Sequence, residues 1–142
     1  MENKYISVVD SFRLLSEVKK LFVYIDKYVY TNFPKDRKHL KILLFDECKS
    51  LYTNIVKASN SEGNVRKKYQ MEALCNISFV DFLIGYLYDL NILIKRRYSS
   101  AIRLLSSVEA MVRMNSKGMG YLLGFFFGVF LCFKCSTFKT FD

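Results

Sequence analysis

A single proline, Pro34, interrupts a chain of 142 residues that holds only six glycines. Proline and glycine are the residues that most often break helices, so their scarcity predicts long helices. The residue before a proline is pushed out of the α region, and proline itself suits the first turn of a helix. Phe33 and Pro34 therefore predict a tight corner between two helices.

Apolar residues recur with the 3.6-residue period of amphipathic helices in four segments. The predicted helices cover residues 11–32, about 35–59, about 66–90 and about 98–116. These helices and the short connections between them predict an all-α fold, an antiparallel up-down four-helix bundle. We expect it to form one domain over residues 1–117. The expected core residues are Leu14, Val18, Phe22, Ile25 and Val29; Leu40, Leu44, Leu51, Ile55 and Ala58; Leu74, Ile77, Val80, Ile84 and Leu87; and Tyr98, Ala101, Ile102, Leu105, Val108 and Val112, with Leu15, Leu21, Leu43, Cys48 and Tyr52 beside them.

The third predicted helix carries a second apolar stripe beside its core stripe. A helix that is apolar on two sides has to bury both of them. In a four-helix bundle one stripe faces the core, so the other predicts contact with a further copy of the chain. The alternative is a central helix wrapped by its neighbours. The residues of this second stripe are Phe79, Phe82, Leu83, Tyr86 and Leu90.

The formal charge of +9 and the pI near 9.4 indicate a polyanionic partner, either nucleic acid or an anionic membrane surface. A solvated basic surface without a partner is the alternative. The cations stand at predicted helix starts, where the helix dipole disfavours them. Antiparallel order would bring the first and last clusters to one end of the bundle. The candidate binding residues are Lys35, Arg37, Lys38 and Lys41; Arg66, Lys67 and Lys68; and Lys95, Arg96 and Arg97, while Tyr98 is expected in the core rather than stacked on a base.

No pattern of residues indicates catalysis or a cofactor. His39 stands alone among cations, and the adjacent carboxylates Asp46 and Glu47 point in different directions on a helix. No phosphate loop, dinucleotide fingerprint or nucleophile elbow occurs. Cys132 and Cys135 form one CxxC without a second pair, which disfavours zinc. The sequence predicts a protein that is not an enzyme and holds no metal.

Residues 118–133 form an uncharged run that contains Gly120, Gly124 and Gly128. A helix of this length reaches roughly 24 Å, short of the ~30 Å hydrocarbon core of a bilayer. We interpret residues 118–142 as an apolar extension that is docked, membrane-associated or the product of a frameshift. A membrane contact would involve this tail only. Residues 1–10 lack the apolar core of a secretory signal, and the cysteines are sparse, so we expect a reduced, cytoplasmic protein.

Several segments occur in an order that resembles a known family. These are "NFPKDRKHL" at the corner, "NIVKASN" at the end of the second helix, an arginine at the start of the third, and "RRYSSAIRLLSSVEAM" in the fourth. Together they resemble the Avd-like four-helix-bundle family over residues 10–120. Its members are accessory variability determinants of diversity-generating retroelements, related to proteins encoded in 23S rRNA intervening sequences. The most telling residues are Phe33, Pro34, Arg37, Leu40, Ile55, Ala58, Asn60 and Tyr98.

The resemblance implies a homopentamer that binds a reverse transcriptase and template RNA, or an RNA/DNA hybrid, and supports mutagenic retrohoming without catalysis of its own. The sequence departs from the family at Gly118 to Tyr121, where a Gly-Gly-Trp-like end is usual. The acidic signature associated with the intervening-sequence branch is absent after Ile55, which favours the retroelement branch. The alternatives are a bundle protein of an rRNA intervening sequence and a small membrane-anchored interaction protein.

Overall fold

The structure, a computed structural model, describes residues 2–114, and the side chains of residues 12–114. The described residues form helices joined by short turns, so the fold class is all-α, with four long helices as the sequence predicts. The apolar extension from Gly118, with its CxxC and its glycine repeat, lies outside the described residues. The helices are α1 (Glu2–Tyr24), α2 (Lys38–Ser59), α3 (Gly63–Asp89) and α4 (Lys95–Met114), and two short helical segments, η1 (Ile25–Val29) and η2 (Lys35–Arg37), flank the Pro34 corner.

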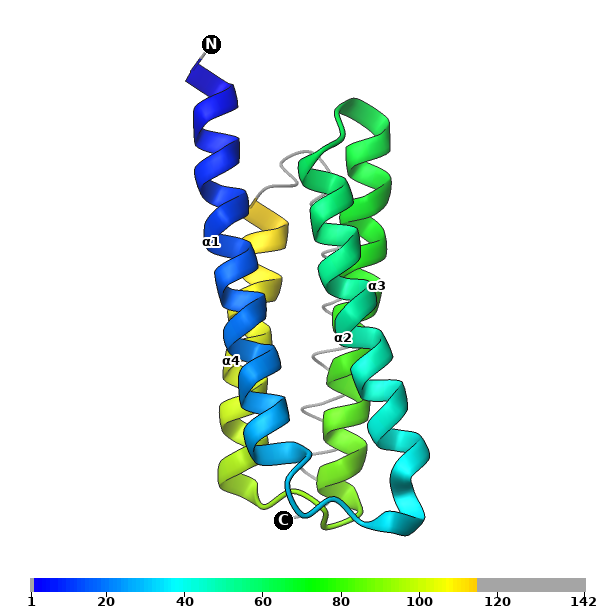
Figure 1. Cartoon of the computed structure of the whole chain (residues 1–142). Coiled ribbons are helices and arrows are strands. Elements are labelled where there is room, and N and C mark those ends of the chain that lie inside the picture. The colour runs from blue at the N-terminus through cyan, green and yellow to red at the C-terminus, as the bar shows by residue number, and fades with distance from the viewer. Residues whose placement is uncertain (1, 115–142) are drawn as a thin grey trace, which may run out of the picture.

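The four long helices lie side by side and contact one another along their lengths (Figure 1). Helix α1 packs against α4 and α2, and α3 packs against the same two helices. In the view of Figure 1, α1 and α3 run downward, whereas α2 and α4 run upward. The end of α1, the start of α2 and the start of α4 therefore meet at the lower end of the molecule, and the turn between α2 and α3 lies at the upper end.

The core is built from the predicted apolar stripes, and the structure differs from the prediction at a few residues. The stripes predicted for α2 and α3 are buried throughout, and in α4 only Ile102 is half-buried. In α1 the prediction for Phe22 is wrong: this ring is 36% exposed, and Leu21, at 1%, fills the core. Phe22 instead approaches the ring of Phe45, with the centroids 5.7 Å apart. Leu43 and Tyr52 are exposed beside the core stripe of α2.

The Pro34 corner forms as predicted, with differences at the helix ends. Helix α1 begins at Glu2, earlier than the expected start at residue 11. It continues into the wide turn η1, where the Tyr30 N–H donates to the Ile25 carbonyl at 3.0 Å. Asn32, with φ of 63°, then reverses the chain in the left-handed region that asparagine tolerates. Pro34 has extended geometry and precedes the first turn of η2 instead of lying within it.

The α3 to α4 connection is shorter than predicted, because α4 already begins at Lys95. Asn91 adopts φ of 60°, and the Ile92 N–H donates to the Leu87 carbonyl at 2.9 Å. This is the bond pattern that ends a helix with a left-handed residue. Leu93, which follows, is buried at 4% exposure. The turn therefore anchors the start of α4 against the core.

A chain of polar side chains links α2 to α3. The Asn54 amide donates to the Asn76 carbonyl oxygen at 2.7 Å, and the Asn76 amide donates to a Glu47 carboxylate oxygen at 2.9 Å. All three side chains are half-buried. Because polar groups at a helix contact must be paired, this chain fixes one register between the two helices.

Among the described residues, α3 alone has the length and mean hydropathy of a membrane-spanning helix. A core helix meets the same criterion, and the side chains of Leu74, Ile77, Val80, Ile84 and Leu87 are all buried within this chain. Packing within the bundle thus accounts for the apolar character of that face of α3.

Candidate nucleic-acid interface

The start of α4 meets the end of α1 through two tyrosines and an arginine. The Tyr24 hydroxyl donates to the Arg97 carbonyl at 3.5 Å. The Arg97 guanidinium lies over the ring of Tyr28, with its central carbon 3.9 Å from the centroid. The two tyrosine rings are 4.7 Å apart, and Lys27 lies 5.1 Å from the Tyr28 centroid. Arg97, one of the predicted binding residues, therefore lies on an aromatic surface.

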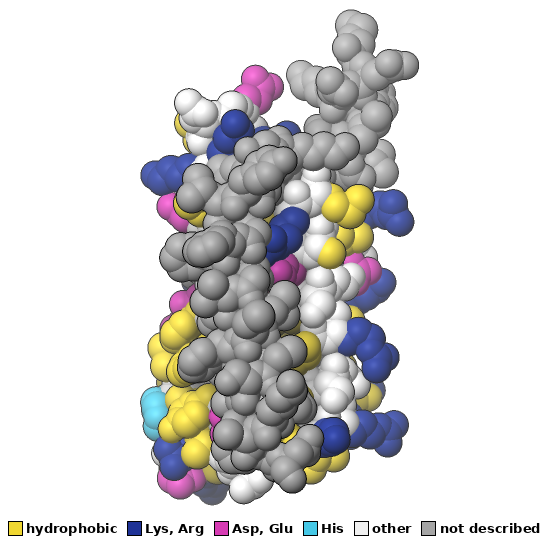
Figure 2. Space-filling model, turned by 180° about the vertical axis from the view of Figure 1, so that it is seen from behind, with side chains coloured by type: hydrophobic (Ala, Val, Ile, Leu, Met, Phe, Trp, Pro, Cys, Tyr) yellow, Lys and Arg dark blue, Asp and Glu magenta, His cyan; other side chains and the backbone are white. Residues whose placement is uncertain are grey.

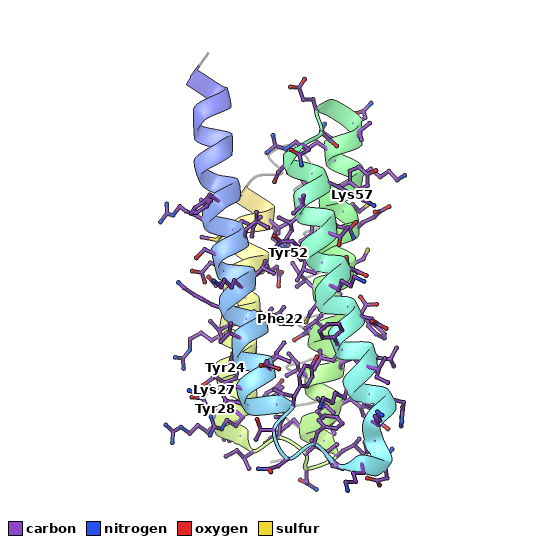
Figure 3. The ribbon with its side chains drawn as sticks, viewed as in Figure 1. Phe22, Tyr24, Lys27, Tyr28, Tyr52 and Lys57 are labelled. Atoms are coloured by element: carbon purple, nitrogen blue, oxygen red, sulfur yellow. The ribbon has the colours of Figure 1, made fainter. Side chains whose placement is uncertain are left out.

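An open groove continues from these tyrosines along α1, beside α4; we call it the α1/α4 groove. Figure 3 labels Tyr24, Lys27 and Tyr28, which lie near one another toward the lower end of α1. Val23 and Leu104 supply apolar surface, the tyrosines supply aromatic surface, and lysines stand at the rim. Its volume is about 370 Å³. The lining residues are Ser16, Lys19, Lys20, Val23, Tyr24, Lys27, Tyr28 and Leu104.

One of the rim lysines is paired and the others make the groove electropositive. The Lys20 ammonium lies 2.8 Å from the Glu17 carboxylate, which also accepts a hydrogen bond from Ser107 at 3.3 Å. Lys20, and then Ser107, hold the pKa of Glu17 below its usual value. Lys27, followed by Arg97, lowers the pKa of the Tyr28 phenol. The same two cations would attract another negatively charged group at this position.

The cations predicted at the Pro34 corner are at the same end of the molecule (Figure 1). Lys35 and Lys38 are exposed, and Arg37 is half-buried. Lys41 lies over the Tyr30 ring, 5.1 Å from its centroid. Three of these cations precede or open α2, so their charges add to the positive end of the helix dipole.

At the start of α4, Lys95 and Arg96 are exposed and Arg97 is half-buried on Tyr28. Tyr98 is buried at 8% exposure and stacks on Tyr88, with the ring centroids 4.6 Å apart. The prediction that Tyr98 belongs to the core is thus confirmed. Burial is the main reason that the pKa of Tyr98 is raised.

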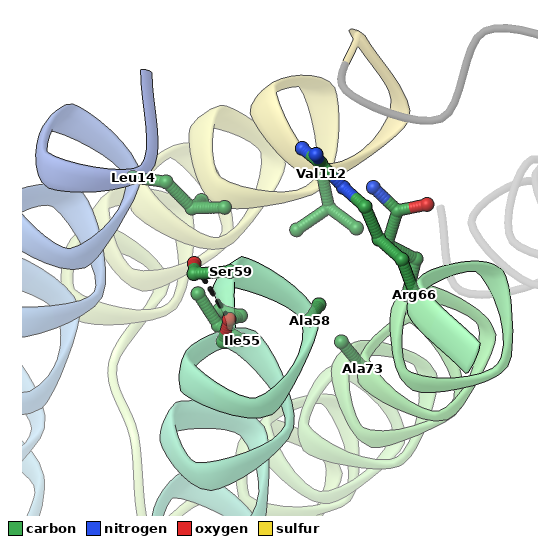
Figure 4. Close-up of a pocket in the computed structure, with 8 residues that line it drawn as sticks. Leu14, Ile55, Ala58, Ser59, Arg66, Ala73 and Val112 are labelled. Atoms are coloured by element: carbon green, nitrogen blue, oxygen red, sulfur yellow. Dashed lines mark hydrogen bonds between the residues drawn. The ribbon is translucent and has the colours of Figure 1, made fainter. Parts of the chain in front are cut away.

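The third predicted cluster lies at the opposite end, at the start of α3. Figure 4 shows Arg66 extending toward Val112 of α4, at the mouth of a small cavity of about 20 Å³. Lys67 and Lys68 are exposed. Lys68 lies 5.8 Å from the Tyr69 ring centroid. This cluster lies away from the cations around Tyr28, so two of the three predicted clusters are at one end of the molecule and the third is at the other (Figure 1).

Sequence reasoning missed Lys19, Lys20 and Lys27 with their two tyrosines. The sequence does contain a pattern that indicates this surface, because Lys20, Tyr24 and Tyr28 are spaced at four-residue intervals that place them on one helix face.

The surface of the molecule differs between its two sides. In Figure 2, Lys and Arg side chains are spaced along the right-hand edge, which is the α1 and α4 side. Hydrophobic side chains are exposed on the lower left, which is the α2 and α3 side.

The second stripe of α3 divides between surface and core. Phe79, Phe82 and Tyr86 are exposed and form a row of rings, with centroids 5.9 Å and 6.3 Å apart. Leu83 is 3% exposed and lies in the core of this chain, and Leu90 is half-buried against that core. We call Phe79, Phe82 and Tyr86 the α3 aromatic row. Leu83 is thus unavailable to a second copy.

The described residues include two free cysteines, of which Cys75 is exposed and Cys48 is buried. Cys48 is buried at 4% exposure, and burial raises its pKa to about 12, so its thiol is protonated at neutral pH. Among the described side chains, those of residues 12–114, no three His, Cys, Asp or Glu gather as a metal site would need. The features that stand out are charge and aromatic surface.

No protein-family model matches the chain, and no curated protein or solved structure shows a significant match. The resemblance to the Avd-like family therefore stays a prediction from the sequence.

Proposed function

We propose that this protein is a non-catalytic RNA-binding subunit, the accessory protein of a diversity-generating retroelement that binds the reverse transcriptase and template RNA. The observation that carries the RNA-binding part is the gathering of cations and tyrosines where α1 ends and α4 begins, above all Arg97 on the ring of Tyr28. The link to a reverse transcriptase comes from the sequence resemblance. The proposed scaffold is an antiparallel up-down four-helix bundle.

The charge distribution supports RNA as the partner. Phosphates are bound by Lys and Arg side chains, and tyrosine rings add stacking surface for bases. Lys19, Lys27 and Arg97 line or flank the α1/α4 groove, and the cations of the Pro34 corner lie at the same end of the molecule. No base-reading motif accompanies them, so binding would follow charge and strand shape and weaken steeply with salt.

The α3 aromatic row supports self-association, the second element of the proposal. Phe82 is 56% exposed, which leaves much of its ring to be buried by another copy. Aromatic residues are enriched in the cores of protein interfaces. The proposed assembly is a homo-oligomer, a pentamer by the resemblance.

The experiment combines light-scattering mass of the full chain with RNA binding titrated against salt. The test variant neutralises Lys35, Arg37, Lys38, Arg96 and Arg97. A control variant neutralises the same number of cations away from this end, at Lys49, Lys57, Lys67, Lys68 and Arg103.

We expect a ring-sized oligomer whose log affinity falls linearly with log salt concentration. The test variant should lower that slope by up to about 0.7 per lost phosphate contact on single strands, and the control variant should lower it much less. Phe82→Ser should reduce the mass without reducing helix content. A monomer that is indifferent to RNA, or equal losses in the two charge variants, would refute the proposal. Co-purification of the full chain with a reverse transcriptase tests the remaining part, and failure to co-purify with one encoded beside this gene would overturn it.

A further inference from the structure

We propose that the α1/α4 groove is a subsite for an unpaired RNA strand, in which a base stacks against the Tyr28 and Arg97 pair and rim lysines hold the adjoining phosphates. This inference rests on the proposed RNA-binding function and deepens it by naming the form of RNA that this groove recognises.

The lining of the groove favours a base over a phosphate alone. Val23 is 51% exposed, and together with Leu104 and two tyrosine rings it gives the groove an apolar and aromatic surface. A purely electrostatic site for phosphates needs no such surface. Bases stack on aromatic rings and on guanidinium planes when they are splayed out of a strand. In a duplex the base faces are covered by their neighbours, so this surface has no partner there.

The cations stand where the backbone of such a strand would run. Lys19 and Lys27 both line the groove and are eight residues apart, which is about 12 Å along a helix. The Lys27 ammonium lies over the Tyr28 ring, 5.1 Å from its centroid, so a base that stacks on this face would move this exposed side chain toward the adjoining phosphate. The positive rim and the apolar surface together match a polyanion that carries flat apolar groups.

The backbone supplies an independent observation. The turn that carries Lys27 and Tyr28 is the π-helical segment Ile25–Val29. Wide turns of this kind occur at the C-terminal ends of helices, and this one ends α1. Ile25 and Val29 remain buried across this turn, so the core is preserved while Lys27 and Tyr28 are displayed beside the start of α4.

The test measures binding of the full chain to a 15-nucleotide single-stranded RNA and to a blunt duplex of the same length, at one salt concentration. Tyr28→Leu removes the ring, and Tyr28→Phe keeps it. Tyr52→Leu is the matched control, because Tyr52 is 50% exposed on α2 and lies away from the groove (Figure 3). Thermal melting of each variant establishes that it is folded.

We expect Tyr28→Leu to weaken single-strand binding by about 5- to 100-fold, the range for loss of one stacked base. Duplex binding should change by less than about twofold, and the salt slope should persist because the cations remain. Tyr28→Phe and Tyr52→Leu should bind like the parent chain. If Tyr28→Leu fails to fold, ultraviolet crosslinking of the parent chain to the single strand should place the crosslink in the peptide that contains Tyr28.

Equal losses for strand and duplex, no effect of Tyr28→Leu, or a crosslink confined to other peptides would overturn the subsite while leaving the RNA-binding proposal standing. A parent chain that binds neither RNA would overturn both. A polyglutamate peptide that binds as tightly as the single strand, and is weakened equally by Tyr28→Leu, would assign the groove to an acidic protein and overturn the inference.

Discussion

Asn76 offers a direct test of how α2 and α3 hold their register. Its amide donates to the Glu47 carboxylate at 2.9 Å, and its carbonyl accepts from Asn54 at 2.7 Å. A hydrogen bond to a charged group contributes about 1.5–3 kcal/mol and a neutral one about 1 kcal/mol. Because the three side chains are half-buried, we take the lower end of these ranges. Asn76→Ala should therefore lower the free energy of unfolding by about 2 kcal/mol, or Tm by roughly 8 °C.

Urea unfolding followed by circular dichroism measures this change. Ser78→Ala is the matched control, because its hydroxyl donates at 3.1 Å to Leu74 of its own helix and does not link α2 to α3. A double-mutant cycle with Asn54→Ala should give a coupling of about 0.5–1 kcal/mol. If Asn76→Ala and Ser78→Ala differ by less than about 0.5 kcal/mol, the polar chain does not stabilise the helix pair and the reasoning fails.

Three further predictions concern buried groups, each measured by urea unfolding. The Tyr30 hydroxyl is buried without a hydrogen-bond partner among the described side chains of residues 12–114, so Tyr30→Phe should leave the free energy of unfolding unchanged or raise it by up to about 1 kcal/mol. Tyr24→Phe, which loses its bond to the Arg97 carbonyl, should not raise it. Leu51 is fully buried, so Leu51→Ala should cost about 3 kcal/mol, against under about 1 kcal/mol for Leu43→Ala on the exposed side of α2. Above pH 9 the unfolded chain loses the Cys48 thiol proton, whereas the folded chain retains it up to a pKa of about 12. Because the unfolded state then binds fewer protons, this thiol should lower the free energy of unfolding by about 1.4 kcal/mol per pH unit. Cys48→Ala should show a shallower decline, and equal slopes would contradict this account.

Periodicity predicts the core where a helix has one unambiguous stripe. The buried residues of α2 and the main stripe of α3 fit this case. In α1 the positions of Leu21 and Phe22 both continue the 3.6-residue repeat after Val18, so the pattern alone could not choose between them. Packing against the other helices placed the smaller Leu21 in the core and left Phe22 beside Phe45.

The ends of helices were harder to predict than their cores. Residues 2–10 contain no proline or glycine that would stop a helix, so α1 extends beyond the amphipathic stripe that starts at Leu14. Gly63 likewise begins α3 three residues ahead of the predicted Arg66, with φ of 59°. A stripe of apolar residues indicates which part of a helix is buried, and it does not show where the backbone stops being helical.

The candidate site was predicted in part because contiguous cations are visible in a sequence and assembled ones are not. Lys95 to Arg97 form a run, whereas Lys19 and Lys27 are separated by a helical repeat. The contact that joins the two groups, Arg97 over Tyr28, links residues about half the chain apart and depends on α4 packing beside α1. A search for cations at helical spacing beside tyrosines would have found the α1 part alone.

The two proposed surfaces can operate at the same time, because they lie on different helices. Since α1 and α3 each pack against α2 and α4, they occupy opposite corners of the bundle. The α1/α4 groove follows α1, and the α3 aromatic row follows α3. A second copy that covers Phe82 would therefore leave Tyr28 and the rim lysines open. Each copy in such an assembly adds one groove, so a long strand that occupies one groove is held at high effective concentration near the next. Self-association would then raise apparent RNA affinity without any new contact to RNA.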